Sequence, residues 1–346
     1  MSSSIDRSIK IDGHTVKNRI LMPPLVCFDW GDSEGFETHP RAPHYGRRAA
    51  GGTGLIVVEA SAVSPEGRLA ETQLGLWRDE HIPQFQRIAE RCHQNNSVVI
   101  VQIVHAGLKA PGKRVYSSSP AELQGKECLE MTADHIARVK EDFLSAALRA
   151  KQAGLDGVEI HGAHGYLINQ FTAGDVNKRT DGYGGSLDNR LRLPLEIVGE
   201  IKEAAGKDFI IGYRFGVNDP TLQEDKYLAG KLEAAGVHML NVSRGIGADA
   251  IEVPGDFPFS KITYLGVALH KSVSIPVACV YGIKKPEQAE YLLANDMVDM
   301  VAVGRGLLAD PQWTNKAIAG QEVDLCHTCA KCKYRGDGTE CPWYQE

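Results

Sequence analysis

The sequence lacks the features that would tie the protein to a membrane or to nucleic acid. No stretch reaches the roughly 18 to 20 consecutive apolar residues that a membrane-spanning helix needs. The first residues do not combine a basic start with an apolar run, as an export signal would. The formal net charge is -6, so there is no basic excess for nucleic acid or an anionic membrane. We therefore expect a cytoplasmic protein with a small-molecule substrate and neither of those partners.

Internal repeats, low-complexity tracts and a break in composition are also absent. With 346 residues, of which 43% are hydrophobic, the chain can bury a large core. Its length suits either one large barrel or two ordinary domains, so length alone does not decide between them.

Eight short apolar runs rich in Val and Ile predict the strands of one parallel sheet. Most of them precede an amphipathic stretch of helical length. Runs that are apolar throughout are typical of strands covered on both faces. The predicted strands are residues 19–25, 53–61, 98–105, 157–161, 209–217, 238–243, 276–281 and 298–303. The clearest predicted helices are residues 81–95, 133–153, 187–205, 223–235 and 286–294.

Eight β/α units without a long linker favour an α/β fold of one kind, a single (β/α)8 TIM barrel, over a doubly wound sheet with an added domain. We assign residues 1–320 to the barrel and residues 321–346 to a short Cys-rich tail. Before the first strand, an alternating pattern surrounds Asp12-Gly13, a pair typical of a tight hairpin turn. We expect this N-terminal β-hairpin to plug the bottom of the barrel.

Three further segments carry expectations about shape. Pro194 falls inside the predicted helix 187–205, which predicts a kink there or a later start of the helix. Residues 28–43 and 108–131 are too long for simple connectors and follow predicted strand ends. We expect both to lie over the mouth of the barrel as lids.

Polar residues gather at the predicted C-terminal strand ends, where a β/α barrel keeps its chemistry. The last strand is followed by Gly304-Arg305, and the sixth by Ser243-Arg244-Gly245. Glycines beside basic or hydroxyl residues can bind phosphate through backbone N–H groups and an arginine fork. The alternative is that the glycines only permit a tight turn and that Arg305 is solvated.

His161, His164 and Tyr166 follow the fourth predicted strand. Two imidazoles can bind a metal, or they can donate hydrogen bonds to a substrate oxygen that gains negative charge. A metal would need a third ligand such as His105, and no carboxylate accompanies the pair in a spacing typical of catalytic zinc. The second role is therefore favoured, with Tyr166 as a neutral proton donor. The alternative is that one histidine and Tyr166 are ordinary packing residues.

The stretch after the fourth predicted strand closely resembles the signature of the old yellow enzyme family. It reads His161-Gly-Ala-His164-Gly-Tyr166 and continues as Asn177-Lys-Arg179-Thr-Asp181-Gly-Tyr183. The likeness extends from residue 5 to about residue 315 and includes Val58-Glu59-Ala60-Ser61 and Val303-Gly304-Arg305.

The resemblance implies an FMN enzyme that takes hydride from NADH or NADPH. Carried over by position, the residues that would hold FMN are Pro24, Leu25, Val26, Ala60, Gln102, His161, Arg214, Ser243, Arg244, Gly245, Gly282, Gly304 and Arg305. The substrate would contact Phe28, His161, His164 and Tyr166. The two histidines would polarise a carbonyl or nitro group, and Tyr166 would protonate the α-carbon. Val26 stands where Thr or Cys is frequent in the family, which predicts an altered flavin reduction potential.

Four of the eight cysteines lie close together near the end of the sequence, as Cys326-x2-Cys329-x2-Cys332-x8-Cys341-Pro. In a cytosolic enzyme this crowding indicates metal binding or redox chemistry, and the spacing is typical of ferredoxin-type ligation. It resembles the 4Fe-4S site of the trimethylamine dehydrogenase and 2,4-dienoyl-CoA reductase branch of the family. A structural zinc held by the same four thiolates and unmetallated thiols stay open as alternatives. The other cysteines, predicted to pack as small apolar residues, are Cys27, Cys92, Cys128 and Cys279.

The leading functional hypothesis is an FMN-dependent NAD(P)H oxidoreductase that reduces activated C=C bonds of enones or enoyl thioesters. One alternative within the same fold is an oxidative enzyme, similar to an amine dehydrogenase, that passes electrons through an iron-sulfur cluster to a partner. Another, from a different class, is a flavin-free barrel lyase or isomerase. We also expect a homo-oligomer.

Overall fold

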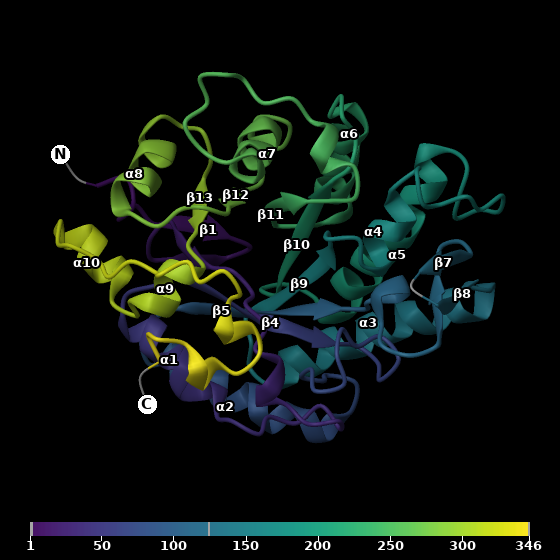
Figure 1. The fold of residues 1–346 in the computed structure, drawn as a ribbon, viewed down its shortest axis with the longest axis horizontal. Helices are drawn as coiled ribbons and strands as arrows, with labels where there is room; N and C mark the ends of the chain where they lie inside the picture. Colours follow the sequence, from purple (N-terminus) through teal and green to yellow (C-terminus); the bar gives the residue numbers. More distant parts are fainter. Residues whose placement is uncertain (1–2, 124, 345–346) are drawn as a thin grey trace.

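The computed structural model describes residues 3–123 and 125–344 and contains a closed barrel of eight parallel strands (Figure 1). Around the barrel these are β3 (Ile20–Met22), β4 (Leu55–Ala62), β5 (Val98–Val104), β9 (Gly157–Gly162), β10 (Ile210–Val217), β11 (Met239–Arg244), β12 (Val277–Val280) and β13 (Met300–Ala302). The strand β13 pairs with β3 and closes the ring. Each strand overlaps one predicted run, so the predicted TIM barrel is confirmed.

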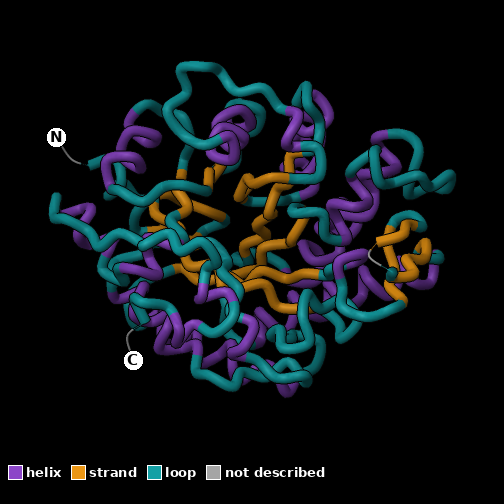
Figure 2. The backbone as a smooth tube through the Cα atoms, viewed as in Figure 1, coloured by secondary structure: helices purple, strands orange, loops and turns teal. Residues whose placement is uncertain are grey.

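Helices surround the strands on the outside, as Figure 2 shows. They are α1 (Arg41–Ala50), α2 (Ile82–His93), α3 (Ala133–Gln152), α4 (Leu167–Thr172), α5 (Leu187–Ala205), α6 (Gln223–Ala235), α7 (Lys261–His270), α8 (Pro286–Ala294), α9 (Arg305–Ala309) and α10 (Trp313–Ala319). The five predicted helices are all present. None of the described helices is long and apolar enough to cross a membrane.

Helix α5 begins where the sequence predicts, although it contains Pro194. The Ser186 side chain accepts a hydrogen bond from the N–H of Asn189 and caps the first turn. The expectation of a later start is therefore wrong, because the cap fixes the N-terminus ahead of the buried Pro194.

The predicted hairpin is formed by β1 (Ile9–Ile11) and β2 (His14–Val16), which pair antiparallel. Both turn residues have positive φ, 42° at Asp12 and 82° at Gly13, as a tight hairpin turn requires. The buried hairpin residues Ile11 and Val16 belong to one apolar cluster with residues of the barrel strands. These include Leu21, Leu55, Val98, Ile210, Met239, Ala278 and Met300. The predicted plug is confirmed.

The two predicted lids have different structures. Residues 28–43 contain a short 3-10 helix (Phe28–Trp30) and the start of α1. Residues 108–131, of which residue 124 lies outside the described part, form a three-stranded sheet of β6 (Arg114–Ser117), β8 (Lys126–Glu130) and β7 (Ala121–Leu123). Figure 1 shows β7 and β8 beside α3, at the side of the barrel.

The chain after α10 returns across the barrel toward α1 (Figure 1). Two short 3-10 helices, Lys333–Arg335 and Gly338–Glu340, are its regular elements. The division of the chain into a barrel (residues 1–320) and a tail (residues 321–346) stays a prediction. Residues 1, 2, 345 and 346 lie outside the described part of the chain. For brevity, residues 321–344 are called the tail below.

Candidate active site

A cavity of about 510 Å³ opens at the C-terminal ends of the barrel strands. Its volume is within the range typical of small-molecule sites. It brings together most of the residues singled out in the sequence. These are Pro24, Leu25, Val26, Phe28, Ala60, Gln102, His161, His164, Tyr166, Arg214, Gly282, Gly304 and Arg305.

Three of the expected cofactor residues do not line this cavity: Ser243, Arg244 and Gly245. The hydroxyl of Ser243 instead shares a 2.8 Å hydrogen bond with Nε2 of His164. Arg244 is exposed and pairs with Asp249 at 2.7 Å. The end of β11 thus supports the histidine from outside the cavity.

Other lining residues were not predicted from the sequence. Lys284 could have been found, because it is a basic residue that follows the seventh strand closely. Leu69, Ile283 and Leu308 could not, since ordinary apolar residues give no sign of facing a site. No described residue of the segment 108–131 lines the cavity, although Lys109 from this segment contacts the carbonyl of His164, whereas Phe28 from the other segment does line it. The role of the two segments as lids stays a prediction.

Arg214, on β10, has a charge that nothing in the described structure fully uses. Its side chain is buried, and its Nε and Nη1 atoms have no hydrogen-bond partner among the described residues. Nearby Glu159 accepts hydrogen bonds from Gln102 (2.7 Å) and Asn241 (2.8 Å). Buried unpaired donors cost free energy unless a ligand accepts from them. The residues present therefore fit an electron-rich acceptor such as the flavin ring.

Another set of residues in the cavity wall suits a phosphate. Lys284 and Arg305 supply cationic groups, and none of the described lining residues is Asp or Glu. Gly282 has a φ of 80°, a backbone conformation that residues with a side chain rarely adopt. A Cβ atom added to Gly304 would lie 3.3 Å from Pro23 and 3.6 Å from Leu25, both at the cavity wall. Glycine there leaves the backbone open to a close ligand.

The side chains of His161, His164 and Tyr166 converge at the cavity. Their ring centres are 5.0 Å apart for the two histidines and 4.8 Å apart for His161 and Tyr166. His164 and Gly165 both have positive φ, 60° and 69°, which turns the chain sharply after β9. The N–H of Gly165 donates to Oδ1 of Asn169, in α4, and holds this turn.

Both histidines are neutral near pH 7. Burial lowers the pKa of His164 to about 3, helped by the charge of Arg214, and lowers the pKa of His161 well below its usual range. The N–H of Ala163 donates to Nδ1 of His161 at 3.2 Å. Since Nδ1 accepts this bond, Nε2 carries the proton and is a donor.

Tyr166 is suited to hold a proton. Burial raises the pKa of its phenol, and the charge of Arg335 offsets part of this effect. Among the described residues, no group of three or more His, Cys, Asp or Glu side chains lies close enough to hold a metal ion. The alternative of a histidine metal site is therefore not supported by the described residues.

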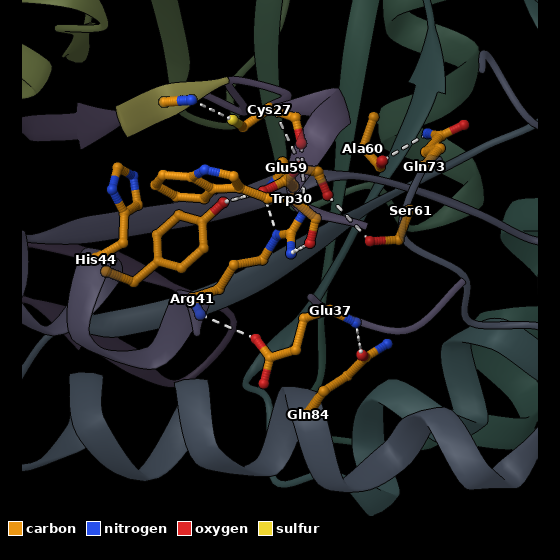
Figure 3. Close-up of polar contacts among 12 residues, drawn as sticks. Cys27, Trp30, Glu37, Arg41, His44, Glu59, Ala60, Ser61, Gln73 and Gln84 are labelled. Carbon is orange, nitrogen blue, oxygen red and sulfur yellow. Dashed lines mark hydrogen bonds and ion pairs between the residues drawn. The ribbon is translucent and has the colours of Figure 1, made fainter. Parts of the chain in front are cut away.

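A buried ion pair fixes the loop that follows β3, as Figure 3 shows. Arg41 Nε donates to Glu59 Oε1 at 2.7 Å, and both side chains are fully buried. Arg41 also donates to the carbonyls of Trp30 (2.6 Å) and Cys27 (3.3 Å), while Glu59 accepts from the Cys27 N–H (3.1 Å). Such pairing is what a buried charge requires. The pair holds the backbone on both sides of Phe28.

The tail is fastened to this same loop. The N–H of Gly338 donates to Cys27 Sγ at 3.0 Å, and the Cys27 thiol donates to the Gly336 carbonyl at 3.4 Å. The indole of Trp30 donates to Asp337 Oδ1 at 3.1 Å. Burial raises the pKa of Cys27 to about 12, so it remains a thiol. Cys27 is buried as predicted, but it also joins two segments by hydrogen bonds.

The four tail cysteines line one small enclosed cavity: Cys326, Cys329, Cys332 and Cys341. Burial, together with the charges of the other three, raises the pKa of the Cys341 thiol. Arg305 and Leu308 line this cavity and also the larger one. The four thiols fit a metal site in kind and number, but as they stand no three are close enough to ligate one ion. The remaining cysteines, Cys92, Cys128 and Cys279, are buried as predicted.

Comparisons with known proteins agree with this geometry. Residues 6–324 match the sequence model of the NADH:flavin oxidoreductase / NADH oxidase family. The NADH oxidase of Thermoanaerobacter brockii is 39% identical over 338 residues, which cover 93% of this chain and 52% of that protein. The NADPH dehydrogenase of Listeria innocua is 36% identical over 323 residues, 91% of this chain and 94% of that one.

Solved structures show the same fold. A 2-naphthoyl-CoA reductase in complex with 2-naphthoyl-CoA has a TM-score of 0.86 and 26% identity, covering 95% of this chain and 54% of that chain. The old yellow enzyme homologue from Zymomonas mobilis has a TM-score of 0.83 and 23% identity, covering 99% and 100%. The chain spans about half the length of the NADH oxidase and of the 2-naphthoyl-CoA reductase.

Proposed function

Because the chain belongs to the NADH:flavin oxidoreductase / NADH oxidase family, we propose that it uses NADH or NADPH to reduce activated C=C bonds of enones and enoyl thioesters. The observation that carries this proposal is the convergence of two neutral histidines and a protonated tyrosine with the unpaired Arg214 on one cavity. One solved relative is named as a complex with a CoA thioester, which favours thioesters among the substrates.

FMN would supply the reversible hydride chemistry that side chains cannot supply. Gln102 and Arg214 would contact its ring, with positive charge at the side where the reduced ring is anionic. Gly282, Lys284, Gly304 and Arg305 would bind its phosphate. Val26 offers the ring no side-chain hydrogen bond, so we expect a flavin potential that differs from relatives with Thr or Cys there.

The histidines and the tyrosine would act on the substrate. Nε2 of His161 would donate to the carbonyl oxygen. His164, whose Nε2 shares a hydrogen bond with Ser243, would donate to the same oxygen through Nδ1. Their hydrogen bonds stabilise the negative charge that this oxygen gains when hydride reaches the β-carbon. Tyr166 would then give its proton to the α-carbon. The sum is one hydride and one proton added across the double bond.

The proposal is tested by anaerobic spectroscopy of the purified protein. Oxidised flavin absorbance is expected to bleach on addition of NADH or NADPH and to return with cyclohexenone. The variant Tyr166→Phe is expected to slow the return by about 10² to 10⁴-fold, while bleaching keeps its rate. Absence of bleaching contradicts the proposed function, and equal loss in both half-reactions contradicts the role of Tyr166.

For the tail we propose a 4Fe-4S cluster held by Cys326, Cys329, Cys332 and Cys341, as in the trimethylamine dehydrogenase and 2,4-dienoyl-CoA reductase branch. The support is one cavity lined by four thiols, and closing the ligand set requires their side chains to move together. A structural zinc with the same ligands is the alternative. Iron, sulfide and zinc analysis of anaerobically purified protein separates the two, and absence of all three contradicts both.

A second candidate function is an oxidative enzyme, similar to an amine dehydrogenase, that sends electrons through the cluster to a partner. The observation that favours it is the shared wall of the two cavities, formed by Arg305 and Leu308. Bleaching of the flavin by amines, without nicotinamide, would support it. The family match gives no support to a flavin-free lyase or isomerase. The expected homo-oligomer stays a prediction.

A further inference from the structure

The tail supplies part of the wall of the cavity of about 510 Å³ at the barrel mouth. Cys332, Tyr334 and Arg335 line it together with Phe28 and Tyr166. The guanidinium carbon of Arg335 lies 5.7 Å from the centre of the Phe28 ring. A cation from the end of the sequence is therefore at the mouth of the barrel, on the side of the proposed proton donor.

The backbone at Arg335 is held on both sides. The hydroxyl of Tyr334 hydrogen-bonds Nε2 of His44 at 3.1 Å, inside the protein. The carbonyl of Gly336 accepts from the N–H of Asp29 at 2.9 Å and from the Cys27 thiol. The guanidinium of Arg335, near the Phe28 ring, makes no side-chain hydrogen bond with a described residue. A cation placed in advance loses less entropy when it binds an anion.

Arg335 has an unused charge. Arg179 and Arg190 pair with carboxylates, whereas Arg335 forms no ion pair and no side-chain hydrogen bond with any described residue. No Asp or Glu is found among the described residues that line the cavity. A guanidinium presents a planar fork of donors, which matches a carboxylate or a phosphate.

The other cations near the cavity have partners or proposed roles. Arg214, Lys284 and Arg305 are assigned above to FMN. Lys109 donates to the carbonyl of His164 at 2.6 Å and supports the turn after β9. Arg335 is thus the cation left for the molecule that is reduced. Its charge already acts at this place, since it lowers the pKa of Tyr166 against the effect of burial.

We propose that Arg335 binds an anionic group, a carboxylate or a phosphate, carried by the substrate, so that the enzyme prefers negatively charged enones or thioesters to neutral ones. This inference rests on the proposed reduction of C=C bonds. One substrate can contact both Arg335 and Tyr166, because they line the same cavity.

The experiment compares charged and neutral substrates with the same reacting group. One arm uses enones with a carboxylate on linkers of increasing length, each with its methyl ester. The other uses crotonyl-CoA and the neutral crotonyl-N-acetylcysteamine thioester. In wild type, kcat/KM is expected to be about tenfold higher for the charged member of one arm, as for one partly solvated charge-assisted hydrogen bond. The arm that shows this preference identifies carboxylate or phosphate.

The variant Arg335→Met is expected to reduce this ratio to about one, Arg335→Lys to retain part of it and Arg335→Glu to invert it. Lys331→Met is the matched control, since it removes a positive charge from the same tail at a residue that does not line the cavity. Arg335 and Lys331 are both exposed, so folding and flavin content are expected to be retained in all four variants. A tenfold preference that persists in Arg335→Met, or wild type with no preference in either arm, overturns the inference.

A binding measurement separates this inference from the proposed reaction. The saturated carboxylates and their methyl esters are titrated into the oxidised enzyme, and the flavin spectrum is followed. If enones are not reduced but carboxylates bind about tenfold tighter, and only with Arg335, the anion site stands and the reaction is wrong. If Arg335→Met instead weakens only NADH or NADPH, the anion belongs to the nucleotide, and the inference is overturned.

Discussion

The two ends of the barrel differ in the polarity of their buried side chains. At the N-terminal end the hairpin packs Ile11 and Val16 onto apolar side chains of the strands, such as Leu55. At the C-terminal end the strands carry buried charges and imidazoles, among them Arg214 and His161. Burial of apolar surface stabilises the fold, whereas unpaired buried polar groups cost stability. One end of the same strands therefore maintains the fold, and the other keeps a cavity prepared for ligands.

The largest expected effect concerns the buried ion pair that holds the loop after β3, to which the tail is fastened. Arg41→Met leaves Glu59 buried without its partner, which is expected to cost about 3–5 kcal/mol in the free energy of unfolding. Urea denaturation measures this loss. The control Arg87→Met removes the Arg87 side chain, which is 55% exposed, from its pair with Glu37, and is expected to cost at most about 1 kcal/mol. Equal losses in the free energy of unfolding for the two variants would contradict the larger contribution expected from the buried pair.

At the bottom of the barrel, Leu55→Ala opens a hole in the apolar cluster. A loss of about 2–5 kcal/mol is expected, because both burial and packing are removed. Because the site is at the other end of the strands, kcat/KM is expected to stay close to wild type. The control Leu148→Ala, at a 39% exposed residue, is expected to change stability by about 0.5 kcal/mol or less. A large loss of activity in Leu55→Ala would contradict the expectation that the apolar end of the barrel affects stability and not catalysis.

At the mouth, a substitution is expected to lower activity and to leave stability nearly unchanged. His161→Ala removes one donor to the substrate oxygen and is expected to lower the rate of flavin reoxidation by enones about 10² to 10³-fold. The unfolding midpoint in urea is expected to stay near wild type, since a desolvated polar group is removed. His14→Ala, in the hairpin at the opposite end, serves as the control for the rate. A variant that unfolds as readily as Leu55→Ala would make His161 a packing residue.

A final expected effect is a pH dependence of stability that arises at the mouth. Burial holds the pKa of His105 at about 4 and that of His164 at about 3, below the usual value of about 6.5. At pH values between the lowered pKa of each histidine in the folded protein and the usual value of about 6.5, the unfolded chain binds a proton that the folded chain does not. Stability is therefore lost as pH falls below about 6.5, by roughly 1.4 kcal/mol per pH unit for each such histidine. Urea midpoints at pH 7, 6 and 5 measure the slope, which His105→Gln is expected to reduce. An unchanged slope in that variant would contradict the neutral state of His105.

Much of the fold could be predicted from the sequence, because local patterns reflect local constraints. Continuously apolar runs predicted all eight strands, and Asp12-Gly13 predicted the hairpin turn. Five helices were not predicted: α1 is amphipathic but strongly polar on average, α7 is largely apolar without a clear period, and α4, α9 and α10 are only five to seven residues long. The strands in residues 114–130 were missed as well, because short strands outside a core carry little hydrophobic pattern.

The site could be predicted in part for the same reason. Residues at strand ends, such as Gln102 and Arg214, could be placed because the barrel topology gathers them at one end. Ser243, Arg244 and Gly245 occupy such an end too, yet they lie outside the cavity. A strand end gives the neighbourhood of a side chain, but the register and the turn that follows decide which way it points.

The sequence alone determined the barrel, the plug and the residues that its strand ends bring together, because these depend on spacing along the chain. Only the tertiary structure decided that the tail returns to the mouth, that Cys27 and the Arg41–Glu59 pair hold it there, and that Arg335 lines the cavity. The Gly338–Cys27 hydrogen bond joins residues 311 positions apart, and even Arg41 and Glu59, 18 positions apart, lie on different elements. Such pairings depend on tertiary packing that no local pattern records.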